Sequence, residues 1–294
     1  MKSRISNAFY EGNRACFWVE DTQFDEVRFY PGEAALMPCK NIEAIHCEFL
    51  GHFSLWNTSR IEITHCHFTR YACSGIWYAY DVKVEDCIFN APGMFRRVKV
   101  LIIKNSSFTD ARECLWDCNN VKLTNVDVVH GDYILMRSES IDIREAQLQG
   151  DHAFYGSRNI IITSTYLDSA SALWNAENVT IYDSVLEGDC LGWHSRNIRL
   201  VNCTLRGRQP FCYASEIRLE KCIMEDAEDC FENSSIDADL QGHVISIKNP
   251  RQGRIRADSI ESVIIDEYCL SPESCRITVN EFPEMSAHDF ISRF

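Results

Sequence analysis

Residues 177–205, ENVTIYDSVLEGDCLGWHSRNIRLVNCTL, contain the pattern that decides the fold. Val179 and Ile181 alternate with polar residues as in a β-strand, and Ile198 and Leu200 repeat the pattern nineteen positions later. An apolar residue that opens such a strand recurs at intervals of nineteen to twenty-one positions, at Ile42, Ile61, Val82, Leu101, Val121, Ile141, Ile160, Val179, Ile198, Ile217, Ile236 and Ile255. A nearly fixed period of this length predicts a solenoid whose units stack on their neighbours.

A second strand is expected five to seven residues after each opening residue, where Cys66 precedes Phe68 and Cys203 precedes Leu205. Inward residues of the first strand lie an even number of positions from the opening residue, whereas those of the second strand lie an odd number from it. A bend must therefore separate the two strands. Asn or Asp, which tolerate the left-handed conformation, often stands at this point: Asp86, Asn105, Asn125, Asp183 and Asn202. We interpret the cysteines as small core residues.

A third strand is expected before each opening residue, in SLWN (54–57), GIWY (75–78), CLWD (114–117), AFYG (153–156) and ALWN (172–175). Three short strands per repeat predict an all-β, single-stranded right-handed parallel β-helix of about twelve coils. We expect one domain over 1–294. In it, 1–35 would supply an N-terminal cap and first coil, 36–235 regular coils, and 236–294 irregular last coils and a C-terminal cap.

Charge and composition limit the classes of partner. The formal net charge is -14 and the sequence pI is about 5.1, which disfavours nucleic acid and membrane surfaces. No apolar signal region or long apolar run occurs, so a cytoplasmic location is expected. The 15 cysteines of such a chain are expected to be reduced.

Aromatic residues recur five residues before the opening residues. The residue before each of them is apolar, so strand alternation would place these rings outside the core, where they could bind sugar rings along a polymer. The alternative is that a bend turns the rings into the core. The expected substrate-binding residues are Trp56, Trp77, Trp116, Tyr155, Trp174 and Trp193.

Acidic residues form a second series. Glu113, Asp132 and Asp151 follow one another at one period each, and Asp189 lies two further periods on. Carboxylates on adjacent coils would stand about 5 Å apart, so they should raise one pKa or hold a divalent cation such as calcium. A pair at this separation could also act as acid and nucleophile on a glycoside. The alternative is a row of solvated turn residues.

Two further side chains are candidates for proton transfer or substrate positioning. These are Arg137 and His194, each of which directly follows the aromatic position. Asp117 lies one coil before Arg137, so an ion pair between them is the alternative. His46 and His65 should also stack, but such surface pairs are seldom metal sites.

Three segments carry a resemblance to known proteins: 172–198 (ALWNAENVTIYDSVLEGDCLGWHSRNI), 209–213 (QPFCY) and 244–253 (VISIKNPRQG). They resemble a bacterial family of unknown function, and the coils resemble the pectin-lyase-like superfamily. The resemblance implies the fold but no catalytic residue. In pectin-lyase-like enzymes the substrate lies along the strand and turn that here carry the aromatic and acidic series.

Three functions follow as hypotheses. The first is a hydrolase or lyase acting on intracellular oligosaccharide, and the second is a non-catalytic carbohydrate or glycoconjugate binder that uses the same face. The third is an interaction scaffold, including a homodimer, whose interface is the aromatic stripe.

Overall fold

The computed structural model describes residues 2–271, 273–279 and 285–286. Contacts divide the chain into two compact units, Met1–Gly150 (unit 1) and Asp151–Phe294 (unit 2). Each is a parallel β-solenoid, and the turns number about 15 in total, compared with the twelve expected. The described residues form no helix that could cross a membrane.

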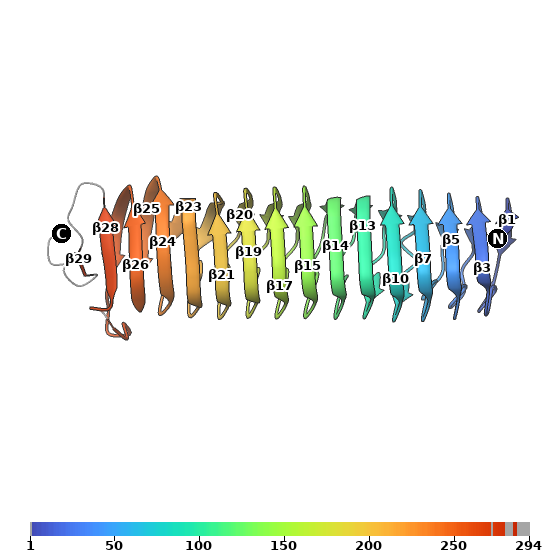
Figure 1. The fold of residues 1–294 in the computed structure, drawn as a ribbon, viewed down its shortest axis with the longest axis horizontal. Helices are drawn as coiled ribbons and strands as arrows, with labels where there is room; N and C mark the ends of the chain where they lie inside the picture. The colour runs from blue at the N-terminus through green and yellow to red at the C-terminus, as the bar shows by residue number, and fades with distance from the viewer. Residues whose placement is uncertain (1, 272, 280–284, 287–294) are drawn as a thin grey trace. The chain divides into compact units, whose positions relative to one another are not determined.

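In unit 1, the strand that opens each coil pairs in parallel with the equivalent strand of the next coil (Figure 1). Ile42 pairs with Ile61, and Val82 with Leu101, so the predicted register is confirmed. These first-side strands are β1 (Ser3–Ser6), β3 (Glu20–Asp25), β5 (Lys40–Ile45), β7 (Ser59–Thr64), β10 (Tyr80–Glu85), β13 (Lys99–Phe108), β14 (Asn119–Val128) and β15 (Glu139–Arg144).

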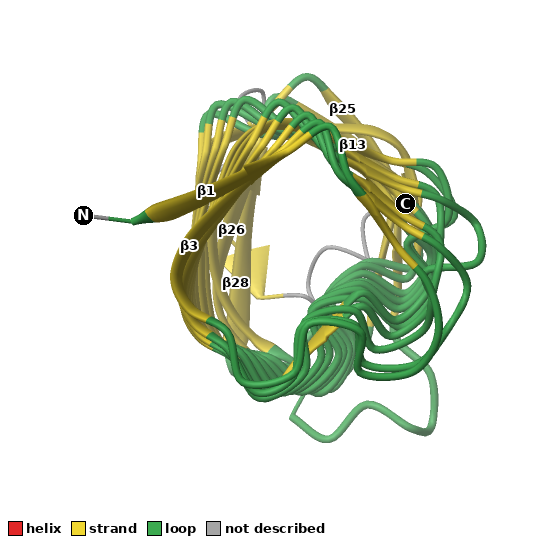
Figure 2. Cartoon of the chain, turned by 90° about the vertical axis from the view of Figure 1, so that its right-hand side faces the viewer, coloured by secondary structure: helices red, strands yellow, loops and turns green. Residues whose placement is uncertain are grey.

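Shorter second-side strands follow after a sharp bend, and β13 and β14 run through the bend without interruption. In the view along the coils in Figure 2, strands form two sides of each coil and loops form most of the third. The second-side strands of unit 1 are β2 (Phe9–Tyr10), β4 (Arg28–Phe29), β6 (Glu48–Phe49), β8 (His67–Phe68), β11 (Ile88–Phe89) and β16 (Gln147–Gln149).

Unit 2 repeats this plan. Its first-side strands are β17 (Arg158–Thr163), β19 (Glu177–Tyr182), β21 (Arg196–Val201), β23 (Ser215–Glu228), β24 (Ser235–Gln241), β26 (Gln252–Ala257) and β28 (Cys275–Val279). The other strands are β18 (Tyr166–Asp168), β20 (Val185–Glu187), β22 (Thr204–Arg208), β25 (His243–Lys248), β27 (Ser259–Ile264) and β29 (Met285–Ser286).

The bend is formed by one left-handed residue in each coil, as predicted. Asn105 and Asn125 have φ of 46° and 51°, and Asp183 and Asn202 have 48° and 55°. The amide of Asn125 donates to that of Asn105 over 3.0 Å, so bend residues also bond from coil to coil.

The core contains the predicted inward pairs in columns. Phenylalanine rings at Phe29, Phe49, Phe68, Phe89 and Phe108 stack with centroids 4.9, 4.4, 4.9 and 4.7 Å apart. This spacing matches the distance between paired strands, about 4.8 Å, so in-register pairing produces the column. All 15 cysteines are free, and burial raises the pKa of the Cys66 thiol, which keeps it protonated.

The expected third strand is wrong for most coils. Among the described residues of unit 1, β9 (Ile76–Trp77) and β12 (Phe95–Arg96) form on this side and pair with each other. In unit 2, β25 reaches this side, where Ile247 forms a bridge with Cys230, and it pairs with β27. Elsewhere the third side consists of turns in which the residue before the aromatic position is left-handed, for example Leu115 (φ 63°) and Leu173 (φ 58°). Two consecutive residues, such as Ala172 and Leu173, are fully buried there. An extended strand points consecutive side chains to opposite faces and cannot bury both.

The predicted register also fails after residue 236. Ala238, not Ile236, pairs with Ile255. The coil between β24 and β26 is therefore two positions shorter than the regular period. Gly253 (φ 120°) permits this, since a Cβ there would lie 1.9 Å from the Ile236 carbonyl oxygen.

Strands occur near both ends of the described part of the chain. Residues 3–29 already form β1 to β4, which continue the coils. At the other end β29 pairs antiparallel with β28. The remaining tail, 280–284 and 287–294, lies outside the described residues.

Phe89→Ala should lower the free energy of unfolding by about 3–5 kcal/mol, because it leaves a cavity in the phenylalanine column. Ile88 on the same strand is 47% exposed, so Ile88→Ala is the matched control and should cost less than about 1 kcal/mol. Urea titrations followed by circular dichroism would measure both. Equal losses would contradict the assignment of inward and outward faces.

Candidate functional site

The aromatic series lies on the surface of the third side. Trp77, Trp116, Trp174 and Trp193 are all half-exposed, and the residue before each of them is buried. The indole N–H of Trp77 donates to the Gly93 carbonyl over 2.7 Å, and those of Trp116 and Trp193 also donate to carbonyls. The rings are therefore fixed against the outside of the coils, and the alternative that they enter the core is excluded.

The remaining members of the series differ. Trp56 and Tyr155 are also half-exposed. Phe231 shares the expected spacing but is fully buried and left-handed (φ 69°), like the residues that precede the tryptophans. Glu232 therefore occupies the aromatic position in that coil.

In unit 1, Arg96 lies between two tryptophans. Its guanidinium carbon is 5.2 Å from the ring centroid of Trp77 and 5.1 Å from that of Trp116. These distances are typical of cation–π contacts, which leave the donor N–H groups of the guanidinium available. No ion pair is found for Arg96 within the described part of the chain.

A surface cavity of about 360 Å³ opens beside this stack. It brings together Trp77 and Glu113, which the sequence predicted, with Arg96 and Arg112, which it did not assign to the site. Arg112 forms a two-point ion pair with Asp110, over 2.8 and 2.6 Å. Glu113 is exposed, and no ion pair to it is found in the described residues. The cavity thus offers an aromatic ring, a cation and an anion from successive coils.

The predicted acidic residues are turn residues. Glu113 and Asp132 lie on adjacent coils of unit 1, because the Glu113 N–H donates to the Asp132 carbonyl over 2.9 Å. In unit 2, the Asp151 carboxylate accepts the Ala170 N–H over 3.1 Å and that of Asp189 accepts the Arg208 N–H over 2.8 Å. Asp151 and Asp189 therefore cap main-chain groups of the next coil, which favours the turn-residue alternative. No group of three side chains suited to a metal ion occurs among the described residues.

Arg137 forms the ion pair that the sequence offered as the alternative to a role in proton transfer. Its Nε and Nη2 donate to the two Asp117 oxygens over 2.9 and 3.1 Å. The Asp117 carboxylate raises the pKa of Arg137 further, so this side chain stays charged.

His194 belongs to an aromatic cluster in unit 2. Its ring stacks on Tyr213 at 5.4 Å, and the Trp174 and Trp193 centroids are 5.2 Å apart. The Tyr213 N–H donates to the carbonyl of the buried Glu232 over 2.7 Å, and the Glu232 carboxylate pairs with Lys248 over 3.6 Å. Tyr213 and this ion pair were not predicted as site residues, because the spacing assigns the aromatic position to Cys212 and Phe231, the residues directly before Tyr213 and Glu232.

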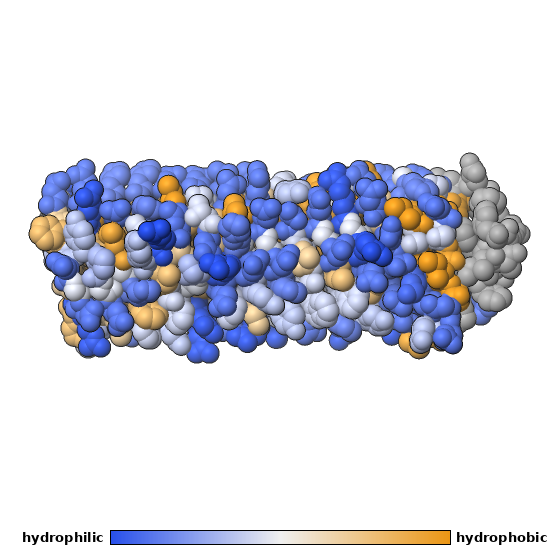
Figure 3. Space-filling view, turned by 180° about the vertical axis from the view of Figure 1, so that it is seen from behind, coloured by the Kyte–Doolittle hydropathy of each residue, from blue (hydrophilic) through white to orange (hydrophobic). Residues whose placement is uncertain are grey.

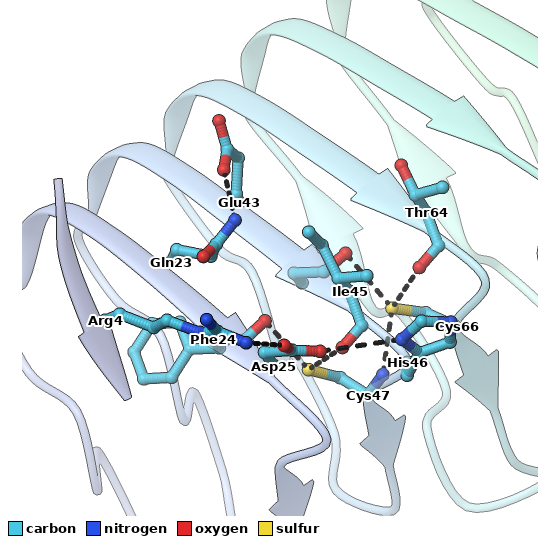
Figure 4. Close-up of polar contacts among 11 residues, drawn as sticks. Arg4, Gln23, Phe24, Asp25, Glu43, Ile45, His46, Cys47, Thr64 and Cys66 are labelled. Carbon is cyan, nitrogen blue, oxygen red and sulfur yellow. Dashed lines mark hydrogen bonds and ion pairs between the residues drawn. The ribbon is translucent and has the colours of Figure 1, made fainter. Parts of the chain in front are cut away.

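Unit 1 has a second, larger cavity of about 580 Å³, near its first coils. Its lining includes Phe9, Arg28 and Tyr30 with His46, His65 and His67. In Figure 4, Asp25 lies between Arg4 and His46, with Cys47 and Cys66 close by. The His46 and His65 rings stack at 5.2 Å, as predicted. Each histidine has a carboxylate oxygen within 3.5 to 3.7 Å.

Residues 3–278 match the model of a family described as Protein of unknown function (DUF3737). The chain belongs to this family. The comparison with curated proteins gave no match.

Among solved structures, this DUF3737 chain is similar to a mutant tailspike protein of E. coli bacteriophage HK620 in complex with a pentasaccharide. The identity is 9%, the match covers 93% of this chain and 72% of the tailspike chain, and the TM-score is 0.50. The A-module of mannuronan C-5 epimerase AlgE4 from Azotobacter vinelandii matches with 11% identity, 95% and 91% coverage and a TM-score of 0.34. At 9% identity the likeness to the tailspike shows the fold alone.

The Arg112 guanidinium lowers the pKa of Asp110 below its usual value. The pair therefore stabilises the fold above the unfolded pKa of Asp110, and this contribution is lost as pH falls through the lower folded value. Asp110→Asn should cost at most about 1 kcal/mol at pH 7, because the pair is partly exposed, and the cost should vanish in strong acid. Urea midpoints across this pH range would measure the change. Arg112→Gln should remove the same pH dependence, and a double variant whose losses simply add would contradict the pairing.

Proposed function

We propose that this chain is a carbohydrate-binding β-helix protein whose binding site in unit 1 is the cavity of Trp77, Arg96 and Glu113. The observation that carries the proposal is the meeting of these three side chains from successive coils in one cavity of about 360 Å³. Sugars present apolar C–H groups beside closely spaced hydroxyls. An indole ring packs against the C–H groups, while a guanidinium donates hydrogen bonds to the hydroxyls and a carboxylate accepts hydrogen bonds from them.

The surface chemistry favours a sugar over a protein partner at this site. The cavity lining sets one indole beside two arginines and a glutamate, and on the face drawn in Figure 3 hydrophobic residues lie mostly singly or in small groups, with a larger group toward one end. A protein interface is expected to have a contiguous apolar centre, whereas a sugar site combines isolated rings with polar groups. The tailspike with which the chain shares its fold holds a pentasaccharide, which supports the proposal by analogy of fold.

Removal of the aromatic or cationic group should weaken glycan binding. Trp77→Ala and Arg96→Gln should each reduce affinity by tenfold or more, because about 1.4 kcal/mol corresponds to tenfold. Retention on an oligosaccharide array, followed by calorimetry with the best ligand, would measure this. Tyr80→Ala is the matched control, since Tyr80 is a 55% exposed aromatic residue that does not line the cavity.

Failure of the wild-type protein to retain any oligosaccharide would refute the proposal, as would unchanged binding in both variants. Turnover separates an enzyme from a binder. If the bound glycan is cleaved, Glu113→Gln or Asp132→Asn should abolish cleavage while binding persists, because glycoside hydrolysis needs a pair of carboxylates. A glycan that stays intact identifies a binding protein.

A further inference from the structure

The aromatic cluster of unit 2 takes no part in the cavity of unit 1. Trp174, Trp193 and Tyr213 lie on the turns before β19, β21 and β23, and their ring centroids are 5.2 and 5.6 Å apart. The His194 ring packs beside all three, at 5.8, 6.1 and 5.4 Å. Because successive coils are about 4.8 Å apart, these four side chains form a platform about 10 Å long over three coils.

The platform faces the solvent. Tyr213 is 43% exposed, His194 is also exposed, and Trp174 and Trp193 are half-exposed. The Trp193 indole N–H donates to the Gln209 carbonyl over 2.8 Å, which fixes that ring on the outside of its coil. A group of large rings held together on the surface is typical of a site that binds a ligand.

Polar groups at the platform remain available to a ligand. No side-chain hydrogen bond is found for Trp174, Asn175 or His194 within residues 2–271, 273–279 and 285–286. Asn175 is exposed and directly follows Trp174. An indole donates one hydrogen bond, whereas an amide and a neutral imidazole each donate and accept. The platform therefore combines ring faces with both of the hydrogen-bonding roles that sugar hydroxyls require.

The charges next to the platform are already paired. The carboxylate nearest in sequence register to Tyr213, that of Glu232, pairs with the Lys248 ammonium over 3.6 Å. In unit 1 the charged Arg96 lies between two tryptophans, whereas the two tryptophans of the platform contact each other directly. An uncharged ligand therefore suits the platform better than an ionic one, because a charged group of a ligand would lose water without gaining an opposite charge.

We propose that this platform is a second carbohydrate site, and that its ligand is an uncharged glycan of at least disaccharide length. The C–H faces of adjoining sugar rings would pack on Trp174 and Tyr213, and their hydroxyls would bond to Asn175 and His194. A platform about 10 Å long is much smaller than a stable protein interface, which buries roughly 800 Å² on each partner. The second site extends the proposed function and does not depend on the cavity of unit 1.

Binding of neutral oligosaccharides tests this inference. A chain with Trp77→Ala, which removes the indole from the cavity of unit 1, should still be retained by an array of uncharged glucans, mannans and galactans. In that background Trp174→Ala and Tyr213→Ala should each lower the affinity for the retained glycan tenfold or more, as measured by calorimetry. Asn175→Ala, at an exposed position, should lower it about threefold, because one hydrogen bond is lost.

Tyr166→Ala is the matched control and should leave the affinity unchanged. Tyr166 is a 39% exposed ring of unit 2, but it lies on β18 and bonds to Glu187. Circular dichroism and unfolding midpoints would show that each variant is folded, and Asn175→Ala tests the site even where the removal of a ring disturbs the coil.

The outcomes separate the two sites. A protein that retains only charged glycans, or whose neutral glycan is lost with Trp77→Ala and kept in the platform variants, would overturn the second site and leave the first. Glycan binding that is lost in the platform variants alone would support the second site and not the first. A change in sedimented mass on Trp174→Ala, with glycan affinity unchanged, would identify a protein interface and overturn the inference.

Discussion

Backbone hydrogen bonds between equivalent residues of successive coils are the constraint on which the structure depends. They set each residue beside its equivalent one period away, so a side chain has the same neighbours above and below wherever the sequence repeats. The Asn197 amide, for example, donates to that of Asn178, which donates to that of Asn159, over 2.8 and 3.1 Å. The phenylalanine column and the Arg96 stack are consequences of the same register. The candidate site depends on it too, since its side chains come from different coils.

Much of this register could be predicted, because it depends only on the coil period and on the alternation of inward and outward residues. Alternation of apolar and polar residues predicts the two inward residues of each first-side strand and the Cys and Phe pair that follows. The left-handed bend is predicted because the inward residues change from even to odd positions between these two strands. The third side could not be predicted in this way. Its consecutive inward residues, such as Ala172 and Leu173, break the alternation rule, and with the half-exposed Trp174 after them the sequence resembles that of a strand.

The failure near the C-terminus has a different cause. Ile236 and Ile255 keep the regular period in the sequence, but the coil between them is shorter, so equal spacing no longer means equal position. The candidate site was predicted only in part for a similar reason. Trp77 and Glu113 were predicted because each belongs to a series of similar residues that repeats with the coil. Arg96 was not, because its role depends on its contacts with Trp77 and Trp116, which only the structure shows. Arg137 is neutralised across a coil boundary by Asp117, whereas no ion pair to Arg96 or Glu113 is found among the described residues.

Chemical labelling of the buried thiols can show where neighbouring coils separate. Cys47, Cys66 and Cys87 stand on successive coils of unit 1, and Cys203 and Cys222 on successive coils of unit 2. A buried thiol reacts with an alkylating reagent only after its coil separates from its neighbour, because the reagent cannot otherwise reach it. The order in which these cysteines become labelled under mild denaturant would therefore record where the solenoid begins to unwind.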